Sequence, residues 1–197
     1  GRKAKAASRV LAKVSPEQKS GTLMALAVTL ESYSDMILDA NLKDVQEAQA
    51  NGTDELWIRD RLDLRPRLKG IAADVRRIAA LPDPVGESFD ERVLENGLRV
   101  SRRNVTVDVI ALAIKTGNAV ILRGGKDAMR SNMMLVRVLR DTLVACGLPA
   151  DSVQYIESAE REYVNEMLRL HEYIDLIIPR GGNALHKLCR ENSTIPV

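Results

Sequence analysis

The stretch Thr116-Gly-Asn-Ala-Val-Ile-Leu-Arg-Gly-Gly-Lys126 decides the fold class of this chain. It opens with a turn signal, Thr116-Gly-Asn118, and continues with the apolar run Ala119-Val-Ile-Leu122. A short apolar run bounded by glycine is typical of a buried strand. The residues that follow predict a long helix from about 127 to 146. A strand followed by a helix is the repeating unit of an α/β fold.

The same alternation continues on both sides of this stretch. Downstream, we predict strands at 153–156 and 174–178, a helix at 160–170 between them and a last helix at 183–190. Upstream, an apolar helix is predicted from 106 to 115. Strands that alternate with helices form a parallel sheet, and the ligands of such sheets bind beyond the carboxyl ends of the strands.

Residues 1–80 predict successive helices. Ser15-Pro-Glu-Gln18 combines an N-cap, a proline at the first helical position and a glutamine three residues after the cap. A further helix is predicted from Ser34 to the stop signal Asn51-Gly52, and another from Pro66 to Ala80. We therefore expect this half of the chain to consist of helices that pack together.

Between the two halves, residues 91–103 hold two short β-type runs around Asn96-Gly97, a strong signal for a hairpin turn. We therefore divide the chain into three parts. Residues 1–84 are expected to form a helical region that packs on the domain to come, 85–103 a β-hairpin, and 104–197 an α/β domain.

The composition excludes several classes of protein. The 197 residues are 45% hydrophobic and 28% charged, with a net charge of +2 spread over both signs. The sequence contains no cluster of positive charges that would indicate binding to a nucleic acid or an anionic membrane. No apolar run reaches the roughly 18 residues that a membrane span needs. We expect a soluble, intracellular protein with neither kind of partner.

Cysteine and histidine give no metal site. Cys146 and Cys189 lie far apart without a CxxC pairing, which argues against a disulfide framework and a structural zinc and favours free thiols. His171 and His186 lack a partner at helical spacing, so we interpret both as structural or surface residues. No pair of residues in this chain forms a convincing nucleophile and base.

Two of the predicted strand ends carry the same motif, Arg-Gly-Gly. Glycine lets a ligand approach the backbone, the next helix start offers free amide donors, and the cations complement phosphate. A tight turn that contains glycine by chance is the alternative for either motif alone. Neither is a GxGxxG fingerprint or a P-loop, which disfavours a standard Rossmann dehydrogenase and a P-loop nucleotidase. The candidate residues are Arg123, Gly124, Gly125 and Lys126 in the first motif, and Arg180, Gly181, Gly182 and Asn183 in the second.

Many stretches of the chain closely resemble the γ-glutamyl phosphate reductase family, a branch of the aldehyde dehydrogenase superfamily. They are Asn104-Val-Thr-Val-Asp108, Lys115 to Lys126, Cys146-Gly-Leu-Pro149, Tyr173 to Gly182 and Leu185 to Arg190, and in the first half Asp39 to Asp44, Asp60 to Leu62, Arg67 to Ala72 and Asp83 to Gly86. The resemblance implies a variant Rossmann-like parallel sheet without the usual glycine fingerprint, preceded by a helical region and a β-hairpin. It makes 104–197 an incomplete NADP-binding domain, with the catalytic domain largely absent from this chain.

The resemblance also implies roles for the candidate residues. Residues 123–126 follow the strand that contacts the adenosine ribose and its 2′-phosphate, and 180–183 lie near the pyrophosphate. Their basic side chains favour NADPH over NADH. Asn104 is similar to the superfamily asparagine whose amide stabilises the oxyanion at the reacting carbonyl. The hairpin is implied to be an oligomerisation element, which makes a homo-oligomer the expected state.

The implied activity is that of a glutamate-5-semialdehyde dehydrogenase, which reduces L-glutamyl 5-phosphate to L-glutamate 5-semialdehyde and releases phosphate. This is the second step of proline biosynthesis, in the cytoplasm, with a glutamate kinase as upstream enzyme or fused domain. In the family a cysteine thiolate displaces phosphate, and NADPH reduces the thioester. Neither Cys146 nor Cys189 matches that cysteine, which the family carries beyond the position of Val197.

The family also carries about fifteen further residues between Arg103 and Asn104, including a strand that a parallel βαβ unit needs before its first helix. We therefore expect the sequence to join segments of a longer protein, and a molecule limited to these residues to lack reductase activity. Three alternatives stay open: a truncated, non-catalytic nucleotide-binding module of the same family, an assembly role for the hairpin, and a superfamily enzyme acting on free aldehydes.

Overall fold

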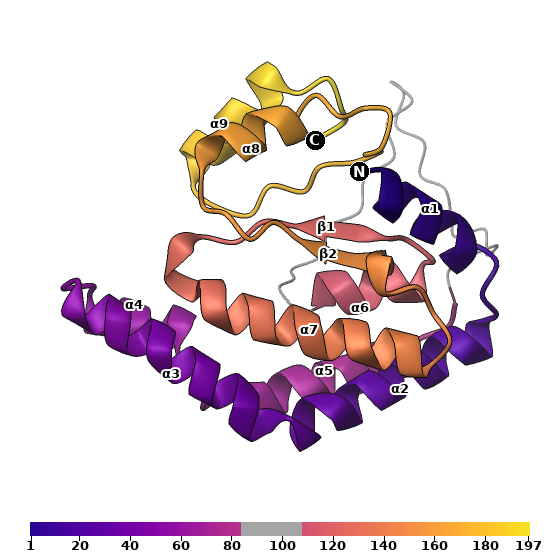
Figure 1. The fold of residues 1–197 in the computed structure, drawn as a ribbon, viewed down its shortest axis with the longest axis horizontal. Coiled ribbons are helices and arrows are strands. Elements are labelled where there is room, and N and C mark those ends of the chain that lie inside the picture. Colours follow the sequence, from indigo (N-terminus) through magenta and orange to yellow (C-terminus); the bar gives the residue numbers. More distant parts are fainter. Residues whose placement is uncertain (84–107) are drawn as a thin grey trace, which may run out of the picture.

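The computed structural model describes residues 1–83 and 108–197 and places helices below and above a small sheet (Figure 1). The helices of the first part are α1 (Arg2–Leu11), α2 (Pro16–Ser32), α3 (Ser34–Ala50), α4 (Glu55–Trp57), the π-helical turn Ile58–Leu62 and α5 (Leu68–Ala80). The second part comprises α6 (Asp108–Lys115), β1 (Val120–Leu122), the 3-10 turn Lys126–Ala128, α7 (Met129–Ala145), the 3-10 turn Ala150–Ser152, β2 (Val153–Tyr155), α8 (Arg161–Met167) and α9 (Asn183–Asn192). The predicted hairpin at 85–103 and Asn104 lie outside the described residues.

The sheet confirms the predicted α/β class. β1 and β2 pair in parallel, with Val120 opposite Val153 and Leu122 opposite Tyr155. The ladder continues one step further, because the Ile156 N–H donates to the Leu122 carbonyl at 2.9 Å. α7 connects the two strands and runs beneath them in Figure 1, so the strand–helix–strand unit expected from the sequence is present.

The strand predicted at 174–178 is wrong. In the described part of the chain this stretch pairs with no strand, and its Ile177 N–H donates instead to the Pro196 carbonyl at 2.9 Å. Leu176 and Ile178 are 57% and 59% exposed, so their apolar side chains do not pack as those of a sheet strand would. The run 119–122 was also expected to be buried, but it is half-buried because the described sheet has only two strands.

The helix ends follow the local signals that the sequence contains. Ser15 caps α2, since its Oγ accepts the Gln18 N–H at 3.2 Å, and Pro16 occupies the first helical position. The Gln18 side chain donates to the Cys146 carbonyl at 3.3 Å and so ties α2 to the end of α7. α3 ends before Gly52, whose φ of +73° lies in the left-handed region that favours glycine.

One hydrophobic core joins the two halves of the chain. α2 packs against α5, α6 and α7. Fully buried side chains come from both halves, and burying each one stabilises the fold by about 1.5–3 kcal/mol. They include Leu23, Leu26 and Leu30 on α2, Val75 on α5, Ile114 on α6, Leu139 and Leu143 on α7, and Val153 on β2. The predicted helical region thus packs directly on the α/β unit.

Two lysines are buried where α2, α5 and α6 meet. The Lys115 Nζ donates to the Ser20 Oγ at 2.7 Å and to the Ala79 carbonyl at 3.0 Å. Lys19 forms an ion pair with Asp83 at 2.5 Å. Both ammonium groups have partners, as buried charges require. Across 1–83 and 108–197, no helix is long and apolar enough to cross a membrane.

Candidate functional site

The first Arg-Gly-Gly motif, residues 123–126, lies directly after β1. Arg123 is half-buried, and its guanidinium donates to the carbonyl of Ala159 in the loop that follows β2. The Arg123 Nε is buried and has no hydrogen-bond partner among the residues that the structure describes. This arginine therefore links the ends of the two strands and keeps one buried donor unpaired, which costs free energy until a partner is found.

The first glycine of each motif is closed off by the protein itself. A Cβ added at Gly124 would lie 2.5 Å from the Asn132 Nδ2 and 2.8 Å from the Tyr155 hydroxyl. A Cβ at Gly181 would lie 2.9 Å from the Leu185 Cδ2. Glycine at these two positions makes room for neighbouring side chains of the same chain.

The second glycine of each motif faces open space. The nearest atom to a Cβ at Gly125 would be the Asp127 Oδ2 at 3.9 Å, and a Cβ at Gly182 would meet no atom within 4 Å. Both glycines have negative φ angles that any residue adopts, so the backbone does not require glycine there. The missing side chain instead leaves the backbone accessible to a ligand.

The second motif, residues 180–183, ends where α9 begins, with Gly182 at the N-cap. In Figure 1 this turn lies on the side toward which β1 and β2 run. Lys126 and Arg180 are exposed, and in the described part of the chain neither forms an ion pair. Each motif thus combines a free cation with an open glycine, although no hydrogen bond between described residues joins the two motifs.

A buried polar network under the first motif was not anticipated from the sequence. The carboxylate of Asp44 on α3 accepts the backbone N–H of Ser131 at 2.8 Å and its hydroxyl at 2.7 Å. Asn41 donates to the same Ser131 Oγ at 3.0 Å and to the Leu62 carbonyl at 2.8 Å, and accepts the Leu64 N–H at 2.9 Å. Asn41 and Asp44 are 1% and 2% exposed. The sequence signal that could have indicated this network is the presence of two polar residues, Asn41 and Asp44, three positions apart on the buried face of a predicted helix.

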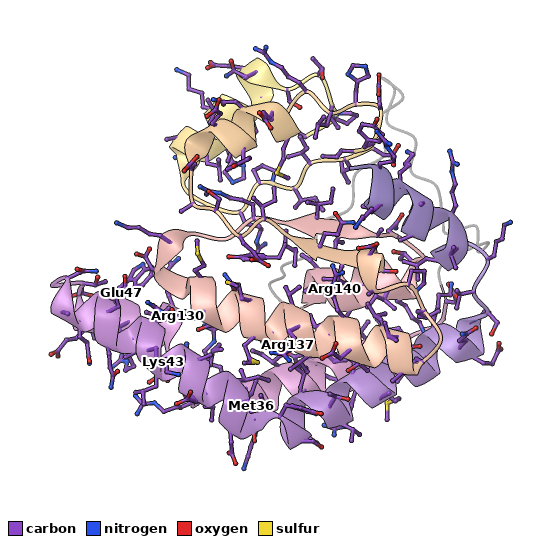
Figure 2. The ribbon with its side chains drawn as sticks, viewed as in Figure 1. Met36, Lys43, Glu47, Arg130, Arg137 and Arg140 are labelled. Atoms are coloured by element: carbon purple, nitrogen blue, oxygen red, sulfur yellow. The ribbon has the colours of Figure 1, made fainter. Side chains whose placement is uncertain are left out.

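Charged residues cover this network on its solvent side. Figure 2 shows Glu47 of α3 and Arg130 of α7 side by side, and their side chains pair at 2.5 Å. Hydrogen bonds to Glu47 and then to Asp44 raise the pKa of Arg130 above its ordinary value. A cavity of about 50 Å³ lies next to this pair and is lined by Asp44, Glu47, Ala48, Asn51, Lys126 and Asp127. The first motif and α3 therefore line the same cavity.

A larger hollow lies elsewhere on the molecule. It has a volume of about 390 Å³ and contains no residue of either motif. Its walls come from α3, α4 and the π-helical turn, with polar groups such as Asp63 and Arg65. No Ser, Thr, Cys, Lys or His side chain is among the described residues that line it.

The cysteines and histidines form no cluster. Cys146 is half-buried, Cys189 is buried, and both are free thiols. His171 is exposed, with its Nδ1 3.1 Å from the Arg169 carbonyl. In the ranges that the structure describes, no group of three or more His, Cys, Asp or Glu is arranged to hold a metal ion.

Comparison with known proteins finds relatives that this chain matches over part of their length. No protein-family model matches the chain. Curated relatives from Escherichia coli O139:H28 and Shigella boydii serotype 18, both named gamma-glutamyl phosphate reductase, are 52% identical over 210 aligned residues. The alignments cover 98% of this chain and 50% of each relative.

Solved structures agree with the curated relatives. The gamma-glutamyl phosphate reductase of Thermotoga maritima has a TM-score of 0.88 and 37% identity, over 99% of this chain and 51% of its own. The corresponding protein of Saccharomyces cerevisiae has a TM-score of 0.84 and 31% identity, over 99% and 53%. A glyceraldehyde-3-phosphate dehydrogenase of Methanocaldococcus jannaschii, at 13% identity, 0.67 TM-score and coverages of 99% and 43%, shares the fold alone.

The chain spans about half the length of the curated relatives that it matches. The 210 aligned positions exceed its 197 residues, so the relatives carry residues inside the matched stretch that this chain lacks. This agrees with the expected gap, whose position between Arg103 and Asn104 stays a prediction. By sequence and by fold, the chain is similar to gamma-glutamyl phosphate reductases over about half of their length, and its fold is of the aldehyde dehydrogenase type.

Proposed function

We propose that this chain provides the NADPH-binding part of an enzyme that reduces L-glutamyl 5-phosphate to L-glutamate 5-semialdehyde and releases phosphate. The observation that carries the proposal is the pair of Arg-Gly-Gly turns, each with an open second glycine beside a free cation. The names of the 52% identical relatives support the reaction and its place in proline biosynthesis.

The residues of both turns fit a dinucleotide with a 2′-phosphate. Gly125 and Gly182 leave the backbone open to a pyrophosphate or ribose, and the first two amides of α9 precede its backbone hydrogen bonds, which begin at Leu185. We assign Arg123 and Lys126 to the 2′-phosphate, because a cation beside an anion forms strong, charge-assisted hydrogen bonds. A movement of Arg123 toward that anion would also give its buried Nε a partner. When bound, NADPH supplies the hydride for the reduction.

The remaining assignments extend this proposal to the rest of the chain. Residues 1–84 support the cofactor domain, 85–103 form an oligomerisation hairpin, and 104–197 hold the cofactor. The Asn104 amide stabilises the oxyanion of the reacting acyl group, a task for a preorganised donor. The nucleophilic cysteine belongs to residues that this sequence does not contain. We propose a cytoplasmic homo-oligomer that receives its substrate from a glutamate kinase.

Two structural neighbours support the choice of cofactor at the level of the fold. The glyceraldehyde-3-phosphate dehydrogenases of Methanocaldococcus jannaschii and Bacillus halodurans were both solved in complex with NADP, and the latter is described as NADP-dependent. At 13% and 19% identity they share the architecture with this chain. The assignment to Arg123 and Lys126 therefore needs its own test.

The test is a titration of the purified protein with NADP⁺ and with NAD⁺. Arg123→Glu reverses the charge that we assign to the 2′-phosphate, so NADP⁺ affinity should fall about tenfold more than NAD⁺ affinity. Arg137→Glu makes the same charge change on the exposed side of α7 (Figure 2) and should leave both affinities within about twofold. Equal losses for the two nucleotides would refute the 2′-phosphate assignment, and a wild-type protein that binds neither would refute the cofactor role.

The second candidate function is a nucleotide-binding module without turnover, which would use the same two Arg-Gly-Gly turns and need no nucleophile. NADP⁺-dependent oxidation of glutamate 5-semialdehyde distinguishes the two. The reductase proposal expects turnover in a protein of the relatives' full length and binding alone in a molecule limited to these 197 residues. Binding without turnover in the full-length protein would leave the module as the function.

A further inference from the structure

We propose that Asp44 of α3 is a positioning residue for residues 123–128, here called the cofactor loop, which it fixes by capping α7 from another helix. The inference rests on the function proposed above for that loop. It gives a role to the buried carboxylate of Asp44, which is not among the residues that we propose to contact the cofactor.

The helix that follows the cofactor loop lacks a cap of its own. The N-cap position of α7 is Ala128, and no side chain of the loop bonds to the first turn. Alanine is among the poorest N-cap residues because it has no oxygen to accept the free amides. A long helix that starts under the ligand-facing end of the sheet would therefore begin with unsatisfied donors.

Asp44 supplies the missing acceptors from α3. One carboxylate oxygen accepts the Ser131 N–H at 2.8 Å, and the other lies 3.3 Å from the Arg130 nitrogen. These are the second and third amides of α7. The negative charge also lies at the positive end of the helix dipole, where it is favourable. The cap is thus made by a residue more than eighty positions away in the sequence.

The residues around Asp44 form a network in which the polar side chains are hydrogen-bonded. Asn41 joins the Ser131 hydroxyl to the Leu62 carbonyl, at the end of the π-helical turn, and is 1% exposed. Arg130 bridges Asp44 at 3.2 Å and Glu47 at 2.5 Å. Every polar side-chain atom of Asn41 and Asp44 has a partner, and fully satisfied buried networks specify one arrangement.

The network around Asp44 contacts the start of α7, and the cofactor loop ends at the residue just before this helix. The 3-10 turn Lys126–Ala128 connects directly to the first residue of α7. Lys126 and Asp127 line the cavity of about 50 Å³ together with Asp44 and Glu47. Binding sites hold their groups to within about 0.5 Å when supporting residues fix them. We infer that α3 sets the position from which Lys126 meets its anion.

The inference is tested by amide hydrogen exchange on the whole chain. Asp44→Asn keeps the size of the side chain but replaces one acceptor oxygen with a donor, so the amides of 126–131 should exchange about tenfold faster or more. The amides of 138–145 at the other end of α7 should stay protected. Unchanged exchange at 126–131, or equal acceleration along all of α7, would overturn the positioning role.

A matched control and a milder variant accompany this measurement. Asp39→Asn makes the same change on the exposed side of α3, where Asp39 pairs with Lys43, and should alter exchange in neither part of α7. Ser131→Ala removes one hydroxyl and keeps the backbone cap, so it should produce a smaller acceleration at the same amides. This variant keeps the inference falsifiable if Asp44→Asn fails to fold.

A second measurement separates positioning from general stability. In Asp44→Asn, the ratio of NADP⁺ to NAD⁺ affinity should fall severalfold while NAD⁺ affinity stays within about twofold, because the displaced end of the loop next to α7 carries Lys126, which we assign to the 2′-phosphate. A purely structural role would lower both affinities together and would contradict the inference. If the wild-type chain binds neither nucleotide, the proposed function fails, and the exchange pattern still decides whether Asp44 positions the loop.

Discussion

Gly125 and Gly182 share one backbone conformation, with φ and ψ of −72° and 166° at Gly125 and −73° and 170° at Gly182. Each residue precedes a helical turn and follows an arginine and a first glycine. Residues with side chains adopt these angles without strain. The two motifs are therefore similar in three dimensions as well as in sequence. Because the angles do not require glycine, its role at both second positions is to leave the backbone uncovered.

Gly125→Ala should separate binding from stability. The new methyl group meets no protein atom closer than 3.9 Å, so the free energy of unfolding should stay the same or rise by about 0.4–1 kcal/mol through a less flexible unfolded chain. NADP⁺ affinity should fall, because the methyl group occupies the side from which a ligand approaches. Urea denaturation and calorimetric titration measure the two quantities, and full affinity in the variant would argue against a ligand at this turn.

Gly124→Ala should have the opposite profile. Its methyl group would lie 2.5 Å from the Asn132 amide nitrogen and 2.8 Å from the Tyr155 hydroxyl. Displacing these side chains should destabilise the fold by about 1–3 kcal/mol. Adding Tyr155→Phe removes the hydroxyl and should recover part of the loss, as a double-mutant cycle in urea would show. A neutral Gly124→Ala would mean that both side chains turn away freely.

Asn41→Ala should be among the most damaging substitutions in the first half of the chain. It leaves the Leu62 carbonyl and the Leu64 N–H without their partner in a buried site and opens a small cavity. We expect a loss of about 2–4 kcal/mol in the free energy of unfolding. Asn192→Ala, on the exposed face of α9, should cost less than about 1 kcal/mol by the same urea measurement. Similar losses for both variants would contradict the buried network.

Asp63→Asn should weaken the acid sensitivity of the fold. Hydrogen bonds from the Arg65 side chain, and then from its backbone, hold the pKa of Asp63 below its ordinary value of 3.8, against the opposing effect of burial. A carboxylate with a lowered folded-state pKa stabilises the fold above pH 3.8, and this stability is lost as the pH falls through the lower value. The wild type should therefore lose more Tm than the variant between about pH 5 and pH 2.5. Parallel curves of Tm against pH would refute this contribution.

The helix boundaries could be predicted from the sequence because their causes are local. The Ser15 cap and the Gly52 stop act within a few residues, and α2 and α3 begin or end where these signals lie. The strand predicted at 174–178 was wrong because its formation depends on a distant part of the chain. Its apolar residues have strand propensity, but pairing needs a neighbouring strand from elsewhere in the chain, and in the described structure this stretch meets Pro196 instead.

The candidate site was predictable in part, for a similar reason. The two Arg-Gly-Gly motifs are visible in the sequence, but which glycine is open depends on Asn132, Tyr155 and Leu185, which the fold brings in from other elements. Asn41 and Asp44 contributed only to the family resemblance. Their role depends on where α7 starts in space, and helix periodicity alone gives no distance between α3 and α7.

Lys115 also has a use as a chemical reporter. The residue is 3% exposed, and its amine donates to the Ser20 hydroxyl and the Ala79 carbonyl. Acylating reagents therefore reach it only when α2, α5 and α6 separate, whereas the exposed Lys43 and Lys69 react in the folded protein. The rate at which Lys115 is labelled would follow the opening of the core that joins the two halves of the chain.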